Sequence, residues 1–135
     1  MKERQKVTTT TPVESNIMLC VTHALKEITP YVYFGKSQTV YPRINCDLRK
    51  FEETDEFCRY RLVLDYLAAD GQPVTVVQMH ELARGILNHG TAETEDGAYI
   101  RFVIDSRGDF VEEPNQKIVH YVDSYEVTYW KNKDI

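Results

Sequence analysis

The sequence predicts an α+β fold in which a single, mostly antiparallel sheet has two helices packed on one face. Three segments carry this prediction: residues 57–67 and 118–130 alternate between apolar and polar side chains, and residues 76–87 have apolar side chains at helical spacing. Alternation indicates half-buried strands, and an apolar stripe indicates a helix that must lie on a sheet. With 135 residues, 42% of them hydrophobic, the chain is long enough for one core and too short for two.

The N-terminal part predicts a flexible arm followed by a helix. Residues 1–14 carry charges and then a run of threonines, so we expect an arm there and a single α+β domain over residues 15–131. A helix can start at Ser15 or Asn16, and Pro30 would end it. Its apolar face consists of Ile17, Met18, Val21, Ala24, Leu25 and Ile28.

The next part predicts two short strands and a long one. Residues 31–34 are β-prone, residues 40–48 form a second strand, and residues 49–56 are a charged connection that resembles a turn. In the long strand, 57–67, we expect one face to be buried and the other to carry charge. The buried face is Cys58, Tyr60, Leu62, Leu64 and Tyr66, and the opposite face carries Arg59, Arg61 and Asp65.

The second helix follows after a tight connection. Thr75 and Gln78 predict a capping box at its start, and the sequence Asn88-His89-Gly90 predicts its end. This assignment places His80 and Glu81 on the solvated side. The predicted apolar stripe is Val76, Met79, Leu82, Ala83, Ile86 and Leu87.

The C-terminal part predicts two further strands. Residues 91–96 are polar, 99–105 alternate, and 106–117 are rich in turn formers and acids, which is typical of an exposed loop. In the closing strand, 118–130, one side carries three tyrosines and a valine. These residues are Tyr121, Tyr125, Val127 and Tyr129.

Composition and charge exclude several classes of protein. A net charge of −5 argues against a nucleic-acid binder, which would usually be basic. Cys20, Cys46 and Cys58 are an odd number without CxxC spacing, and two of them lie in apolar patterns, so we expect buried reduced thiols in a reducing cytoplasm. No segment approaches eighteen apolar residues, so we expect no membrane span.

The candidate chemical motifs are incomplete. His80 and Glu81 begin a sequence like the HExxH zinc motif, but Arg84 stands where a zinc site needs its second histidine. His23, His89 and His120 are scattered, and the acids around Glu52 and Glu112 are in polar surroundings that favour solvated charge. We therefore expect no catalytic residue, no metal and no cofactor.

Aromatic and charged residues instead indicate a binding or assembly surface. Nine tyrosines and Trp130 are residue types favoured both in cores and at interfaces. Arg43, Arg49, Lys50, Arg59 and Arg61 give one region of the sheet a basic side, whereas the acids lie in loops. A heterologous ring contact needs two such complementary patches, although a solvated face explains the charges equally well. The predicted interface residues are Arg49, Lys50, Glu52, Glu53, Arg59, Arg61, Arg107, Asp109, Glu112 and Glu113.

The order of elements resembles that of small bacteriophage tail terminator and minor tail proteins, including those of prophages. The resemblance rests on the helix at 16–28, the segment PYVYFG at 30–35, the strand at 60–66, the helix ending in ELARGIL at 81–87 and the closing strand at 118–130. It covers residues 15–130 and is one of pattern, without a shared chemical motif. The threonine-rich arm is not part of it.

This resemblance implies a non-enzymatic virion protein assembled in the bacterial cytoplasm. Such a protein would form a ring, typically a hexamer, at the head-proximal end of the tail, stop tail-tube polymerisation and join the tail to the neck. Its partners would be further copies of itself, the tail tube protein and a neck protein. Two alternatives are a small module that binds a protein or peptide through its tyrosine-rich sheet, and a small enzyme whose site assembles from distant residues such as Cys46.

Overall fold

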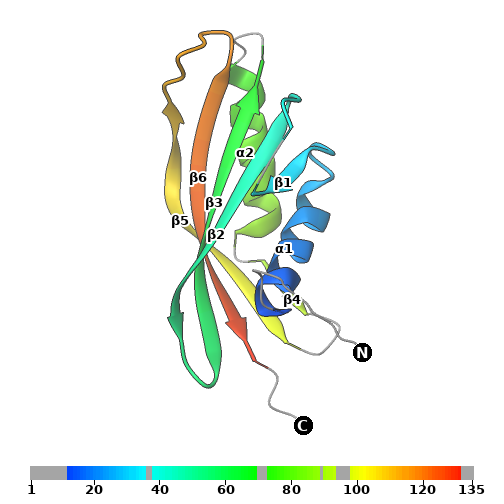
Figure 1. The fold of residues 1–135 in the computed structure, drawn as a ribbon, viewed down its shortest axis with the longest axis vertical. Coiled ribbons are helices and arrows are strands. Elements are labelled where there is room, and N and C mark those ends of the chain that lie inside the picture. The colour runs from blue at the N-terminus through cyan, green and yellow to red at the C-terminus, as the bar shows by residue number, and fades with distance from the viewer. Residues whose placement is uncertain (1–11, 36–37, 70–72, 89, 94–97, 132–135) are drawn as a thin grey trace, which may run out of the picture.

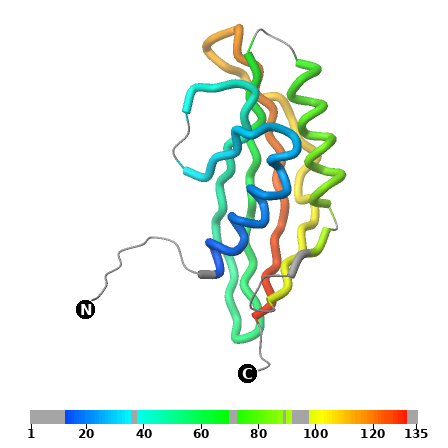
Figure 2. The backbone as a smooth tube through the Cα atoms, turned by 90° about the vertical axis from the view of Figure 1, so that its right-hand side faces the viewer, coloured from blue at the N-terminus to red at the C-terminus, as the bar shows by residue number. Residues whose placement is uncertain are grey.

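In the computed structural model, six strands form one sheet, and both helices lie on the same side of it (Figure 1 and Figure 2). The structure describes residues 12–35, 38–69, 73–88, 90–93 and 98–131. The strands follow the order β1-β2-β3-β6-β5-β4, with β1 parallel to β2 and every other pair antiparallel. The predicted fold class is therefore confirmed. The strands are β1 (Val32–Phe34), β2 (Arg43–Glu53), β3 (Phe57–Ala68), β4 (Thr91–Glu93), β5 (Tyr99–Val111) and β6 (Val119–Trp130), and the helices are α1 (Pro12–Leu25) and α2 (Pro73–Leu87).

Helix α1 begins at Pro12, earlier than the predicted start at Ser15 or Asn16. Proline suits the first helical turn because it lacks the backbone N–H that would have no partner there. Ile17, Val21 and Leu25 are fully buried against the rest of the core. Residues 1–11, which make up most of the predicted arm, lie outside the described residues.

The two central strands, β3 and β6, supply the middle of the core. The predicted alternation of β3 is confirmed, since Cys58, Tyr60, Leu62, Leu64 and Tyr66 are all at most 2% exposed. On β6 the buried side chains are Asp123, Tyr125, Val127 and Tyr129. Cys46 on β2 is buried as well, so two of the three cysteines are buried, as predicted.

Strands β2 and β5 are longer than predicted. The expected connection at 49–56 is wrong for its first five residues, because β2 continues to Glu53 and pairs with β3 up to Cys58. The expected loop at 106–117 is wrong for residues 106–111, which belong to β5. The sequence indicated loops in both segments because their side chains are mostly exposed and charged. They lack buried apolar side chains, and the hairpin of β2 and β3 extends beyond the helices (Figure 1). The polar residues 91–93, assigned to no element, form the edge strand β4.

Helix α2 lies on the sheet at a different rotation from the predicted one. It begins at Pro73, so Thr75 is inside the helix and the predicted capping box is wrong. Its buried residues are Val76, Met79, His80, Ala83 and Leu87. His80 therefore lies in the core, whereas Leu82 and Ile86 are 57% and 38% exposed. No helix in the described part of the chain is long and apolar enough to cross a membrane.

Candidate functional site

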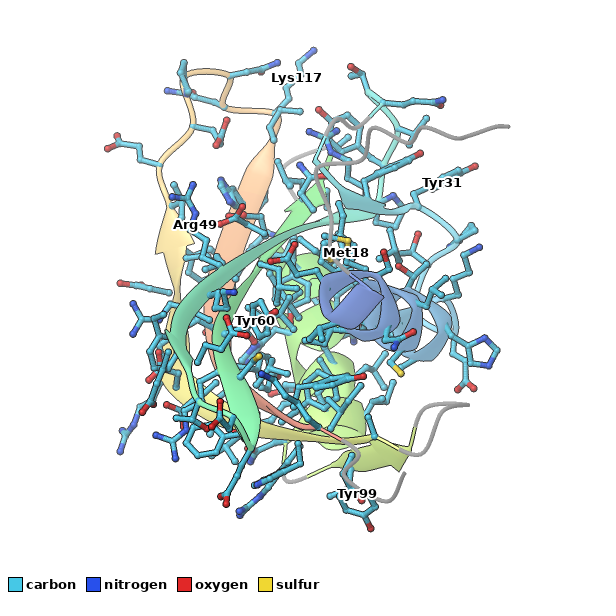
Figure 3. All side chains as sticks on the ribbon, turned by 60° about the horizontal axis from the view of Figure 1, so that its bottom comes forward. Met18, Tyr31, Arg49, Tyr60, Tyr99 and Lys117 are labelled. Carbon is cyan, nitrogen blue, oxygen red and sulfur yellow. The ribbon has the colours of Figure 1, made fainter. Side chains whose placement is uncertain are left out.

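The open face of the sheet, on the side away from both helices, is left uncovered by the fold (Figure 1 and Figure 2). The strand register places Asp47, Arg49, Arg61 and Val63 on this face, because their neighbours along each strand point into the core. Figure 3 shows Arg49 on the side of the sheet opposite the helices, while Tyr60 points toward them. A two-layer fold thus presents a broad surface for contacts without exposing its core.

Charges on this face are paired within the chain. Arg49 Nε lies 2.8 Å from Asp47 Oδ2, and Arg61 Nε lies 3.1 Å from Asp105 Oδ2. Arg59 pairs with Glu52 at 3.1 Å in the same way. Each of these three arginines therefore has an acidic partner within the chain.

A shallow hollow lies on the open face beside these pairs. Asp47, Arg49, Phe51, Arg61 and Val63 line it, and its volume is about 410 Å³. Phe51, next to a register shift in β2, is 53% exposed. Arg49 lies directly across from Arg61 in the ladder, an arrangement of like charges that is unfavourable unless acids balance it. The hollow therefore combines apolar side chains with two neighbouring guanidinium groups.

The tip of the β2–β3 hairpin holds a second group of predicted interface residues. Lys50 Nζ lies 2.6 Å from Glu53 Oε1, and Lys131 Nζ lies 3.1 Å from Glu53 Oε2. These two bonds lower the pKa of Glu53 to about 2, and the bond to Lys50 has the larger effect. The group is exposed, so we assign it to the local geometry of the hairpin and not to the stability of the fold.

The remaining predicted interface residues lie at the other end of the sheet. Arg107 and Asp109 are exposed on β5, and Glu112 and Glu113 follow in the connection to β6. This connection and the β2–β3 hairpin are at opposite ends of the molecule (Figure 1). The structure therefore divides the predicted interface into two separate surfaces.

The sequence indicated no partner for His120, but in the structure this side chain lies between two carboxylates. Its Nε2 is 2.6 Å from Asp65 Oδ1 and its Nδ1 is 2.8 Å from Glu113 Oε2. This arrangement fixes the ring between β3, β6 and the loop after β5. Across the described residues, no group of three or more histidine, cysteine or acidic side chains could hold a metal ion.

His80 belongs to a buried polar cluster that sequence reasoning missed. Its Nδ1 lies 2.6 Å from Asp123 Oδ2, and the Tyr66 hydroxyl donates to both carboxylate oxygens of Asp123 at 3.1 Å. Burial raises the pKa of Asp123, against the opposing effects of His80, Tyr66 and Arg84. Burial and the nearby Asp123 also raise the pKa of Tyr66.

The geometry of this cluster favours a structural role. His80 is 5% exposed and Asp123 is fully buried, so in this conformation a substrate has no access to either side chain. The cluster joins α2 to β3 and β6 through directional bonds. One sequence signal could have found it: Asp123 shares the inward-facing register of Tyr121 and Tyr125, and a buried carboxylate requires a partner.

The same fold occurs in a chain from a solved structure described as "Virion of native gene transfer agent (GTA) particle". The two structures agree with a TM-score of 0.70 over 90% of this chain and 100% of that chain, with 6% sequence identity. At this identity the likeness shows a shared fold. No protein-family model matches the chain, and no curated protein matches it.

Proposed function

We propose that this protein is a structural component of a phage-like particle. The observation that carries the proposal is the agreement of fold along the whole length of a virion chain, with a TM-score of 0.70. The alignment covers 90% of this chain and 100% of the virion chain, so the likeness is not limited to a common supersecondary motif. The chemistry is consistent with this role, since the buried polar cluster is closed to substrate.

The more specific proposal is a ring at the head-proximal end of the tail. There the protein would stop polymerisation of the tail tube and join the tail to the neck, without enzymatic activity. Its partners would be further copies of itself, six in a hexameric ring, together with the tail tube protein and a neck protein. The resemblance of residues 15–130 to tail terminator proteins supports this role, and so do the open sheet face and the two separate charged ends.

Two surfaces at opposite ends suit a protein that joins two assemblies. The hairpin end carries Lys50, Glu53 and Lys131, and the opposite end carries Glu112 and Glu113. Surface charge of this kind steers association and sets specificity more than it adds affinity. A ring protein would present one end to the tube and the other to the neck.

The test is the effect of the full chain on growing tail tubes. The purified protein is added to polymerising tail tube protein from the same particle, and tube length and end structure are measured by negative-stain microscopy. We expect shorter tubes with a ring of extra density at one end. Tubes of unchanged length, with the protein left in the soluble fraction, would contradict the terminator role.

Immunogold labelling of intact particles tests the coarser proposal. Label at the junction of head and tail supports a virion component in the proposed position. Label elsewhere on the particle would keep the structural role and reject the ring position. Particles that contain none of the protein would reject both and favour the protein-binding module.

A further inference from the structure

A second exposed apolar surface lies on the outer side of α2. Val74, Leu82 and Ile86 are 60%, 57% and 38% exposed, and the acidic side chain of Glu81 is exposed beside them. Isolated apolar side chains are ordinary on a surface, but Leu82 and Ile86 are neighbours one turn apart and form a small patch, with Val74 two turns before Leu82 on the same helix. This patch points away from the sheet, because the opposite side of α2 is buried against it.

Gly85 lies within this patch, and the fold of the single chain does not explain it. A Cβ atom built at Gly85 would meet no heavy atom within 4 Å, and its backbone is not in the left-handed region. Glycine is less favourable than alanine in a helix interior. The absence of a side chain here leaves room for the close approach of another molecule.

The hollow on the open face of the sheet has the complementary chemistry. Phe51 and Val63 supply apolar contact, and Arg49 and Arg61 lie side by side with 80% and 59% of their side chains exposed. Each guanidinium bonds its acid in the chain, Asp47 or Asp105, through Nε. A guanidinium has five N–H donors, so the Nη groups can still bind an acid on a partner helix that also has an apolar face. The α2 patch offers both, in Glu81 and its apolar neighbours.

We propose that the outer face of α2 of one copy docks in the hollow on the open sheet face of a second copy, with Glu81 against Arg49 and Arg61. The inference rests on the proposed ring and names its subunit contact. Both helices cover one face of the sheet (Figure 2). The outer side of α2 and the open sheet face therefore lie on opposite sides of the two-layer fold. A contact between different patches is heterologous and leaves one unused patch at each end of the assembly, so it closes into a ring when the rotation between neighbouring subunits permits.

The first test is a charge reversal on each side of the contact. Glu81→Arg and Arg61→Glu are made in the full chain singly and together, and the dissociation constant of self-association is measured by sedimentation velocity. We expect each single variant to weaken association by roughly tenfold or more, and the double variant to restore most of it. Arg101→Glu, on the same open face but two strands away from Arg61, is the matched control and should associate as the wild type does.

Substitution of Gly85 separates the contact from the stability of the fold. Gly85→Gln should raise the melting temperature of the monomer, because the helix gains a better helix former. The same variant should weaken association, because a long side chain fills the approach to the helix. A destabilised or misfolded protein would show the opposite change in melting temperature, so the two effects remain distinct.

Several results would overturn the contact. One is a wild-type chain that stays monomeric at every concentration, and another is single variants that associate as tightly as the wild type. The others are a double variant that associates no more tightly than the single variants, and a Gly85→Gln variant whose dissociation constant is unchanged. If the protein caps tubes but the reversals have no effect, the proposed function stands and this contact fails. If the reversals behave as expected but tubes are not capped, the contact stands and the terminator role fails.

Discussion

Removing the carboxylate of Asp123 should show how much the buried polar cluster contributes to the free energy of unfolding. In Asp123→Ala, the Tyr66 hydroxyl and the His80 ring nitrogen both lose the partner they have in the core. Each buried polar group left without a partner costs about 1–3 kcal/mol, so we expect a loss of about 2–6 kcal/mol in the free energy of unfolding. Asp123→Asn keeps an oxygen for Tyr66 and an amide for His80, and should cost only about 1 kcal/mol.

Urea unfolding followed by far-ultraviolet circular dichroism measures both variants. The matched pair separates the hydrogen bonds from the volume of the side chain, since asparagine and aspartate are nearly the same size. A double-mutant cycle with Tyr66→Phe should give a coupling energy with Asp123→Ala of about 1–3 kcal/mol. Equal unfolding midpoints for the alanine and asparagine variants would refute the cluster as a source of stability.

The pH dependence of this comparison has a definite sign. Burial raises the pKa of Asp123 in the folded protein above its ordinary value of 3.8. Between pH 3.8 and the raised native pKa, the native state binds more protons than the unfolded state. The stability contributed by the protonated carboxyl is therefore lost as pH rises through this range. We therefore expect the wild type to lose stability relative to Asp123→Asn from pH 3.8 upward through the raised native pKa.

Three further predictions concern single side chains. Gly85→Ala should raise the free energy of unfolding by about 1 kcal/mol in thermal melts, because the new methyl group improves helix propensity without a clash. Gly108→Ala should lower it by about 1–3 kcal/mol in the same assay, because Gly108 has φ +96° and a Cβ there would lie 2.7 Å from the Tyr121 ring. Lys50→Ala should raise the pKa of Glu53 from about 2 toward 4.5 in a carboxyl NMR titration, because the first of its two lysine bonds is lost.

The central strands were predictable because one face of each is buried. On β3 every second residue from Cys58 to Tyr66 is apolar and enters the core, so the sequence pattern and the burial pattern coincide. The outer halves of β2 and β5 were not predictable in this way. At Arg49 and Asp109 the strand is exposed, so hydrophobic alternation gives no signal and only backbone pairing across the sheet keeps the chain extended.

The rotation of α2 could not be read from its own sequence. Leu82 and Ile86 are apolar and adjoin the buried residues, so a stripe that contains them competes with one that contains His80. The choice is made by Asp123 on β6, whose buried carboxylate needs a donor from the helix that covers it. Turning α2 to bury Leu82 would remove His80 from Asp123 and leave that carboxylate without this partner in the core.

This rotation also connects the buried cluster to the proposed subunit contact. The bond between His80 and Asp123 fixes which side of α2 faces the sheet, and therefore places Leu82, Gly85 and Ile86 on the outside. The apolar surface on the outer side is thus a consequence of polar bonding inside. A variant that weakens the cluster without unfolding the chain, such as Asp123→Asn, should leave the helix less firmly oriented and weaken self-association as well. If association proves indifferent to Asp123→Asn while Glu81→Arg abolishes it, the helix is held in place by its apolar contacts alone.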